Sequence, residues 1–113
     1  MLTHETCGHE KIVSKIKSEL MDEKDILLMV KLFKVLADET RIKILYAISK
    51  HEVCVSDIAS IINLSQSAVS HQLSTLKDAN LIRSRREKQT IYYTLVDDHV
   101  HLIFNQALSH IKE

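Results

Sequence analysis

The sequence has no proline and a single glycine, Gly8, in 113 residues. Flexible linkers between domains are commonly rich in these two residue types, so we expect no linker and no domain boundary inside the chain. Long apolar runs are also missing, and no stretch approaches the roughly 20 residues that a membrane-spanning helix needs. With 45% hydrophobic residues, the chain predicts one globular domain over residues 1–113, small enough to gain stability by dimerisation.

Cysteine is scarce, since the chain contains only Cys7 and Cys54. Two cysteines do not indicate the disulfide framework of a small secreted protein. The first ten residues, MLTHETCGHE, lack the basic and apolar regions of a signal peptide. We therefore expect a cytoplasmic protein with no membrane partner, in which both cysteines are thiols or metal ligands.

The formal net charge is zero, with 15 basic and 15 acidic residues, but the charges are unevenly distributed. Residues 65–93 contain five Lys and Arg against two Asp and Glu, a local charge of +3. Residues 1–64 contain nine basic against ten acidic residues, and residues 94–113 contain one against three. The middle segment can therefore meet nucleic-acid phosphates, although such a charge is also ordinary for a surface segment.

Two helices are predicted on either side of a short polar turn near Leu64. The second has an apolar stripe on one side and small polar residues near the start of the other side: Gln66, Ser67, Ser70, His71 and Ser74. We expect Ser56 to cap the first helix and Ser65 to cap the second. A helix-turn-helix over residues 55–80 would insert its second helix into the DNA major groove. The alternative is an ordinary solvent-exposed helix.

Apolar residues at helical spacing predict two earlier helices, over residues 10–20 and 26–37. Asp38 can cap a third helix that contains residues 42–48. After the helix-turn-helix, LIRSRR and TIYYTLV predict two antiparallel strands of a hairpin wing over residues 81–96, separated by Glu87, Lys88 and Gln89.

Basic side chains are concentrated in this wing, at Arg83, Arg85, Arg86 and Lys88. They can contact phosphates or enter a minor groove. They can equally protect an exposed strand edge from pairing with another chain. The wing therefore predicts either a nucleic-acid contact or a solvated hairpin.

The last helix, over residues 98–113, carries an apolar stripe flanked at its two ends by candidate Zn²⁺ ligands: Asp97, His99, His110 and Glu113. Eleven residues separate the two histidines, about 16 Å along a helix, whereas zinc ligands lie about 2 Å from the ion. One helix therefore cannot form the site alone, but two copies packed antiparallel would form two equivalent sites.

These residues also have ordinary structural explanations. Asp97 or Asp98 can cap the helix, and His110 can act as a favourable charge at its C-terminus. His101 lies on the opposite side from His99 by helical phase, so we expect it to be a surface residue.

Four stretches, LADETRIKIL, EVCVSDIA, SQSAVSHQLSTLKDANLI and IYYTLVDDHV, together resemble the ArsR/SmtB family of metal-sensing winged-helix repressors, most closely its zinc-sensing SmtB branch. The resemblance covers about residues 26–113. It implies a mainly α fold with a small β-hairpin, a winged helix-turn-helix that is dimeric through its N-terminal (residues 1–21) and C-terminal helices. One departure is Lys88, because the family usually has a glycine at this position of the wing tip. Lysine is poorly suited to the positive φ that glycine permits in such a turn.

The zinc-sensing members use an Asp-x-His pair and a His-x-x-Glu or His-x-x-His pair in the last helix. The resemblance therefore implies that Asp97, His99, His110 and Glu113 bind Zn(II), with Co(II), Cd(II) or Ni(II) as other candidate ions. From their positions in the second helix of the helix-turn-helix, which would be the recognition helix, and in the wing, we expect the following residues to contact DNA: Gln66, Ser67, Ser70, His71, Arg85, Arg86 and Lys88.

A second metal site is suggested by related sensors that bind metal between the N-terminal arm and the cysteine-containing helix. Its candidate ligands are Cys54 and Asp57 with Cys7 and His4 or His9. Sensors of cadmium, lead or arsenic typically carry a second cysteine where this chain has Ser56, which favours zinc. Cys54 can also be simply a small buried residue.

The sequence therefore predicts a homodimeric repressor that binds double-stranded operator DNA without metal and releases it when Zn(II) binds. By resemblance, it would control genes of metal efflux or sequestration. Neither catalysis nor a small-molecule substrate is expected. The alternatives are a thiol redox-responsive repressor using Cys7 and Cys54, and a zinc-dependent hydrolase, for which the sequence offers no separate acid–base or phosphate-binding motif.

Overall fold

The structure, a computed structural model, describes residues 9–113 and divides the chain into two compact units, Met1–Lys31 and Leu32–Glu113. In the first unit, helix α2 (Glu10–Glu19) confirms the helix predicted over residues 10–20. Every residue of α2 is exposed, including its apolar stripe. Helix α3 (Glu23–Leu36) begins in the first unit and ends in the second. That residues 1–113 form a single domain stays a prediction.

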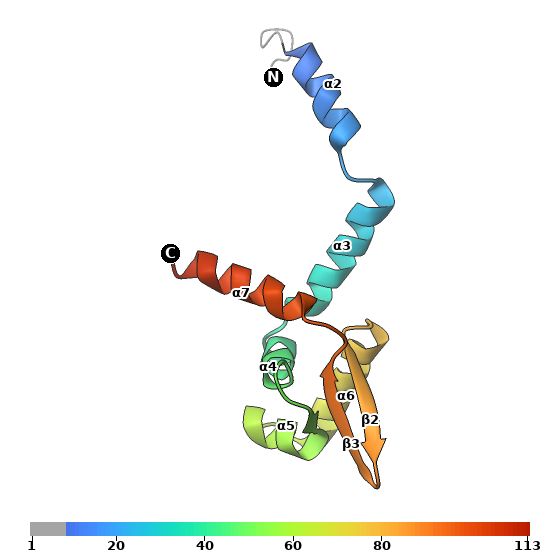
Figure 1. Cartoon of the computed structure of the whole chain (residues 1–113), viewed down its shortest axis with the longest axis vertical. Helices are drawn as coiled ribbons and strands as arrows, with labels where there is room; N and C mark the ends of the chain where they lie inside the picture. The colour runs from blue at the N-terminus through green and yellow to red at the C-terminus, as the bar shows by residue number, and fades with distance from the viewer. Residues whose placement is uncertain (1–8) are drawn as a thin grey trace. The chain divides into compact units, whose positions relative to one another are not determined.

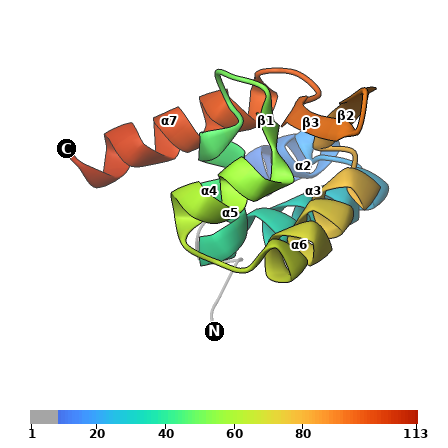
Figure 2. The same cartoon turned by 90° about the horizontal axis from the view of Figure 1, so that it is seen from below.

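The second unit contains the predicted winged helix-turn-helix. After the end of α3 come α4 (Glu39–Ala47), β1 (Val53–Cys54), α5 (Val55–Ile62), α6 (Gln66–Asp78), β2 (Ile82–Glu87), β3 (Thr90–Leu95) and α7 (His99–Ile111). Helices α4, α5 and α6 pack together (Figure 2), and the β2–β3 hairpin lies beside α6 (Figure 1). The mainly α fold with a small sheet is confirmed. Among the described residues, no helix has the length and apolarity to cross a membrane.

The core of this unit is formed where α4, α5 and α6 meet. Its most deeply buried side chains are all aliphatic: Ile44, Leu45, Ile48, Ile58, Val69, Leu73 and Leu76. Three of these come from α6, which therefore turns its apolar side inward. Burying each such side chain stabilises the fold by about 1.5–3 kcal/mol. The polar side of α6 is consequently fixed on the surface.

Two of the predicted helix caps are confirmed. The Asp38 carboxylate accepts a hydrogen bond from the backbone N–H of Arg41 (3.0 Å), at the start of α4. The Ser65 hydroxyl accepts one from the backbone N–H of Ala68 (3.1 Å), at the start of α6. Both side chains satisfy a donor that an α-helix leaves without an internal partner.

The predicted Ser56 cap is wrong. Helix α5 begins at Val55, directly after β1, and the extended residue Cys54 occupies its N-cap position. Ser56 lies within the first turn, where its Oγ is 3.3 Å from Cys54 Sγ. The helix therefore starts earlier than the serine indicated, because β1 delivers the chain directly into it.

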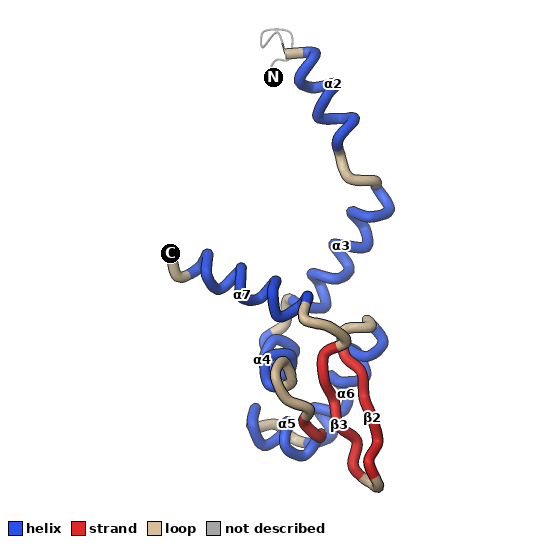
Figure 3. Tube along the Cα trace, viewed as in Figure 1, coloured by secondary structure: helices blue, strands red, loops and turns tan. Residues whose placement is uncertain are grey.

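The sheet has three antiparallel strands in the order β1-β3-β2, and its hairpin confirms the wing (Figure 3). Strand β1 was not predicted, because two residues are too short to show an alternating pattern; Val53 pairs with Tyr93. Glu87 pairs with Thr90, so Glu87 belongs to β2 and the turn consists of Lys88 and Gln89. The first strand of the wing therefore has the predicted length of six residues but lies one residue further along the chain than predicted.

Lys88 has φ = 59°, in the left-handed region. Asn63 and Asn80 also have positive φ, but asparagine tolerates this conformation well. For a lysine it costs about 1–2 kcal/mol. The wing tip thus keeps the backbone geometry that favours glycine while carrying a basic side chain.

Replacing Lys88 with glycine should stabilise the protein by about 0.5–1 kcal/mol, because relief of the left-handed conformation exceeds the added entropy of the unfolded chain. Urea unfolding at a fixed protein concentration measures the change. Gln89→Gly is the matched control, since Gln89 is not among the residues with positive φ, and it should not stabilise. Equal or lower stability for Lys88→Gly would contradict the strain argument.

Candidate functional site

The first candidate surface is the polar side of α6. Gln66, Ser67, Ser70 and His71 are all exposed in its first half, as is Ser74 one turn later. Their position follows from the packing of Val69, Leu73 and Leu76 on the opposite side. Hydroxyl, amide and imidazole groups near a helix N-terminus can bind base edges and phosphates. The structure therefore presents the four predicted DNA-contact residues of α6 together.

The wing presents a second, basic surface, but its cationic side chains differ in whether they already pair with a carboxylate. Arg85 Nε donates to both carboxylate oxygens of Glu52 (2.9 Å each), and Glu87 lies 3.5 Å from its Nη1. Its guanidinium also lies 5.0 Å from the centre of the Tyr92 ring. The hydrogen bond that Arg85 donates to Glu52 raises the pKa of Arg85 above its ordinary value. Arg85 is therefore held against the sheet, and a phosphate would have to compete with Glu52.

Arg86 and Lys88 are exposed, and neither forms an ion pair with any residue that the structure describes. Lys77, near the end of α6, instead donates to Ser84 Oγ in β2 (2.9 Å), which ties the helix to the wing. The sequence did not distinguish Arg85 from Arg86, because Glu52 lies 33 residues away along the chain.

The first candidate metal pair lies at the start of α7. The Asp97 carboxylate accepts a hydrogen bond from the His99 backbone N–H (3.0 Å), and its other oxygen lies 3.1 Å from His99 Nδ1. The capping contact considered for Asp97 or Asp98 is thus made by Asp97. Asp98 occupies the N-cap position itself. The carboxylate and the imidazole are held together and remain exposed.

The second candidate metal pair lies at the other end of α7. His110 Nδ1 is 4.0 Å from Glu113 Oε2, and the two side chains are 83% and 76% exposed. Within residues 9–113, no three His, Cys, Asp or Glu side chains come close enough together to hold a metal ion. Each end of α7 therefore offers one imidazole and one carboxylate, which suits half of a tetrahedral Zn²⁺ site.

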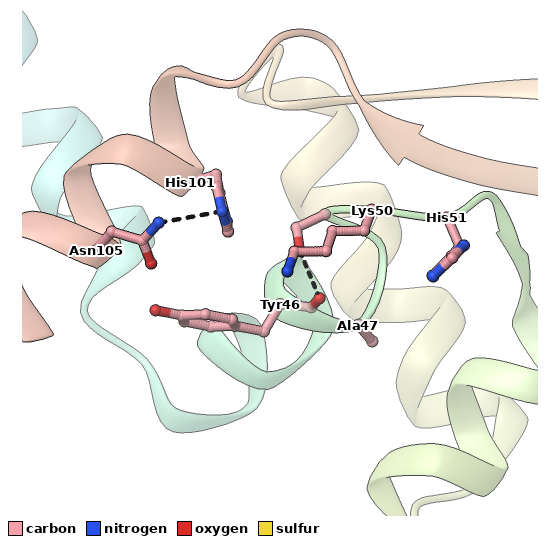
Figure 4. Close-up of a pocket in the computed structure, with 7 residues that line it drawn as sticks. Tyr46, Ala47, Lys50, His51, His101 and Asn105 are labelled. Carbon is pink, nitrogen blue, oxygen red and sulfur yellow. Dashed lines mark hydrogen bonds between the residues drawn. The ribbon is translucent and has the colours of Figure 1, made fainter.

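His101 is not the surface residue that helical phase predicted. It is half-buried against α4, where its ring stands edge-on to Tyr46, with ring centres 6.3 Å apart (Figure 4). Its Nε2 lies 3.1 Å from Asn105 Nδ2, while its Nδ1 is buried without a partner among the described residues. The helical phase was right in placing the His101 and His99 side chains on different sides of α7. The side of α7 opposite His99 packs on α4 instead of facing solvent.

The residues of the predicted second metal site are only partly described. Cys54 is half-buried at the start of α5, and Asp57 is exposed in the first turn of that helix. His9 is exposed and belongs to the first unit. Cys7 and His4 lie outside the described residues. This second site stays a prediction.

Comparison with known proteins gives a consistent result. Residues 38–84 match the family described as bacterial regulatory protein, arsR family. The chain is 34% identical to a transcriptional repressor SmtB homolog of Synechocystis over 93% of this chain and 80% of that protein. It is 38% identical to a homolog of the cadmium resistance transcriptional regulatory protein CadC of Staphylococcus aureus, over 93% and 87%.

A solved structure agrees with the fold. The homodimeric winged helix-turn-helix DNA-binding domain of a possible ArsR-family regulator from Mycobacterium bovis superimposes with a TM-score of 0.72. The match covers 83% of this chain and 89% of that one, at 27% identity. The fold of the second unit is thus that of a known class of DNA-binding domain.

Arg86→Gln should weaken binding to duplex DNA of arbitrary sequence and reduce the salt slope of log affinity by about 0.9, as loss of one phosphate contact does. Arg85→Gln should change the slope less, because Glu52 already pairs with that guanidinium. Glu52→Gln should increase the slope by releasing Arg85. Fluorescence anisotropy across a salt series measures all three, and equal effects for Arg85→Gln and Arg86→Gln would contradict the distinction.

Proposed function

Because this chain belongs to the ArsR family of bacterial transcription regulators, and is therefore not an enzyme, we propose that it is a cytoplasmic, metal-responsive repressor that binds operator DNA as a homodimer. Its metal-free form holds the operator, and Zn(II) binding releases it. The genes it controls would serve metal efflux or sequestration. The similarity to an SmtB homolog and to a CadC homolog supports a role in metal response.

The observation that carries this proposal is the division of the metal ligands between the two ends of α7. Asp97 and His99 lie at one end, with His110 and Glu113 at the other, and all four are exposed. The proposed dimer packs two α7 helices antiparallel, so that each pair meets the complementary pair of the partner subunit. Exposed apolar residues on α7, namely Leu102, Leu108 and Ile111, would be covered in this interface. The homodimeric relative supports such an assembly.

Zinc is the proposed ion because of the donor set. Two imidazoles and two carboxylates suit Zn²⁺, whereas softer ions such as Cd²⁺ bind more favourably to thiolates. At the start of α5, Ser56 stands beside Cys54 and contributes a hydroxyl instead of a second thiol. Co(II), Ni(II) and Cd(II) are the ions to compare with zinc in competition. The second site, with Cys7, His9, Cys54 and Asp57, would add a thiolate contribution.

Metal binding must favour the conformation with low DNA affinity, because an ion with equal affinity for both conformations shifts nothing. One backbone hydrogen bond in the second unit supports a connection between the proposed metal site and the proposed DNA-contact surface. Val96, next to Asp97, donates its backbone N–H to the carbonyl oxygen of Leu81 (3.1 Å), just after α6. A displacement at the start of α7 would therefore reach the end of the recognition helix.

Ser70→Ala and His71→Ala should each weaken binding to a selected operator duplex by about tenfold, because each removes a hydrogen-bonding group from the proposed DNA-facing side of α6. Zinc affinity and dimerisation should be unchanged. Electrophoretic mobility shift and calorimetry measure these properties. Ser60→Ala, on the exposed surface of α5, is the control. Wild-type operator affinity in both variants would mean that α6 is not the recognition helix.

His99→Ala and His110→Ala should each give a repressor that still binds operator DNA but is not released by Zn²⁺. His51→Ala, which removes an exposed histidine outside the proposed site, should respond normally. A sharper test mixes the two metal variants in one dimer. Both substitutions then fall in the same intersubunit site and leave the other intact, so about one high-affinity Zn²⁺ per dimer should remain.

Zero high-affinity ions in that mixed dimer would refute the antiparallel site, provided that the single-variant homodimers are folded and dimeric. Cys54→Ser tests the thiol alternative in the same assay. Loss of the operator response to oxidant, with the zinc response retained, would identify a separate redox switch. Loss of the zinc response would instead assign regulation to the cysteine-containing site.

A further inference from the structure

Arg41, in the first turn of α4, connects three helices of the second unit. Its backbone N–H donates to the Asp38 cap, as described above. Its side-chain Nε donates to the carbonyl oxygen of Val35 (2.6 Å), in the last turn of α3. Its Nη1 donates to Gln72 Oε1 (3.1 Å), in the middle of α6. One guanidinium thus links the end of α3 directly to the proposed recognition helix.

The contact with Val35 is favourable for a specific reason. The last four carbonyl groups of an α-helix have no acceptor role within the helix, and the C-terminus carries a partial negative charge. Arg41 satisfies one of these groups with a cation. Because the guanidinium is planar, its donors point in fixed directions relative to one another. While both hydrogen bonds are formed, the position of the Val35 oxygen therefore restricts where Gln72 Oε1 can lie.

Gln72 directly follows His71 in α6. The position of the Gln72 side chain is therefore coupled to the direction in which the proposed DNA-facing side chains of α6 point. The apolar contacts of Val69, Leu73 and Leu76 hold α6 on the core, but apolar burial is non-directional. A hydrogen bond weakens steeply when its angle departs from linearity. The Arg41–Gln72 bond thus restrains rotation of α6 about its own axis, which the apolar contacts restrain less sharply.

We propose that Arg41 is a positioning residue for operator recognition, which acts through Gln72 to fix the rotation of α6. The proposal rests on the DNA-binding function proposed above. It assigns Arg41 no contact with DNA. Its effect is on discrimination between sequences, because a rotated helix would still meet phosphates but would no longer align Ser70 and His71 with particular base edges.

The test uses the metal-free, full-length protein and two duplexes. One is the duplex that the wild type recovers from a random-sequence library, and the other is a scrambled duplex of the same composition. Gln72→Met removes the acceptor at similar side-chain length, and it should lower affinity for the selected duplex about tenfold while leaving the scrambled duplex unchanged. Arg41→Lys, whose ammonium lacks the planar fork, should lower the same ratio of affinities.

Two variants serve as controls. Gln72→Glu keeps an acceptor for Arg41 and should retain the wild-type ratio, even if its negative charge weakens both duplexes equally. Lys43→Met removes an exposed cation from the same helix and should also retain the ratio. In the double variant Arg41→Lys, Gln72→Met, the ratio should fall no further than in Gln72→Met, because both changes break the same bond.

The outcomes separate this proposal from the proposed function. If the wild type prefers its selected duplex but Gln72→Met and Arg41→Lys keep the full preference, the positioning role is wrong and the DNA-binding function stands. If either variant loses both affinities in parallel, Arg41 serves folding alone, and the positioning role is again wrong. A wild type that selects no sequence overturns the proposed function and this proposal with it.

Discussion

The buried side of α6 is the constraint on which the rest of the second unit depends. Val69, Leu73 and Leu76 are almost completely excluded from solvent, and they fix which side of the helix can face a partner. Polar contacts of α6 lie at its ends and flank. Ser65 caps its start, Lys77 joins its end to β2, and Gln72 ties its middle to Arg41. Apolar burial is the main favourable contribution to folding but is non-directional, whereas hydrogen bonds depend on angle and can therefore restrain the orientation of a helix.

A second constraint is the mismatch between the length of α7 and the size of a metal coordination sphere. Two histidines separated by about 16 Å cannot bind one ion whose ligands lie about 2 Å from it. The proposed zinc site therefore requires two chains, which makes metal occupancy and dimer geometry interdependent. An ion bound in this way can alter the relation between two DNA-binding units without approaching DNA itself.

Periodicity predicted the helices and the wing because both depend on local patterns. Asp38 and Ser65 acted as expected, since a cap bonds to a backbone group three residues away. The Ser56 cap failed because α5 begins directly after β1, and the contacts that were missed involve partners that are distant in sequence. Strand β1 exists because Val53 pairs with Tyr93, and Arg85 is held by Glu52. Such contacts leave no periodic pattern, and the roles of Arg41 and Glu52 could not be predicted without the fold.

His101 shows what helical phase can and cannot predict. The phase correctly directs this side chain away from His99, but it does not tell whether that direction leads to solvent or to a neighbouring helix. In the structure it leads to Tyr46, which also stacks on Phe104 with ring centres 5.4 Å apart.

This aromatic contact anchors the start of α7 on α4, whereas residues toward its C-terminus are exposed. In the proposed dimer, a metal ion bridging two such helices would therefore act on an element that is packed on α4 at one end and exposed, within the part of the chain that the structure describes, at the other. In the proposed function, a displacement of the start of α7 would be the route by which the ion acts on the DNA-binding surface.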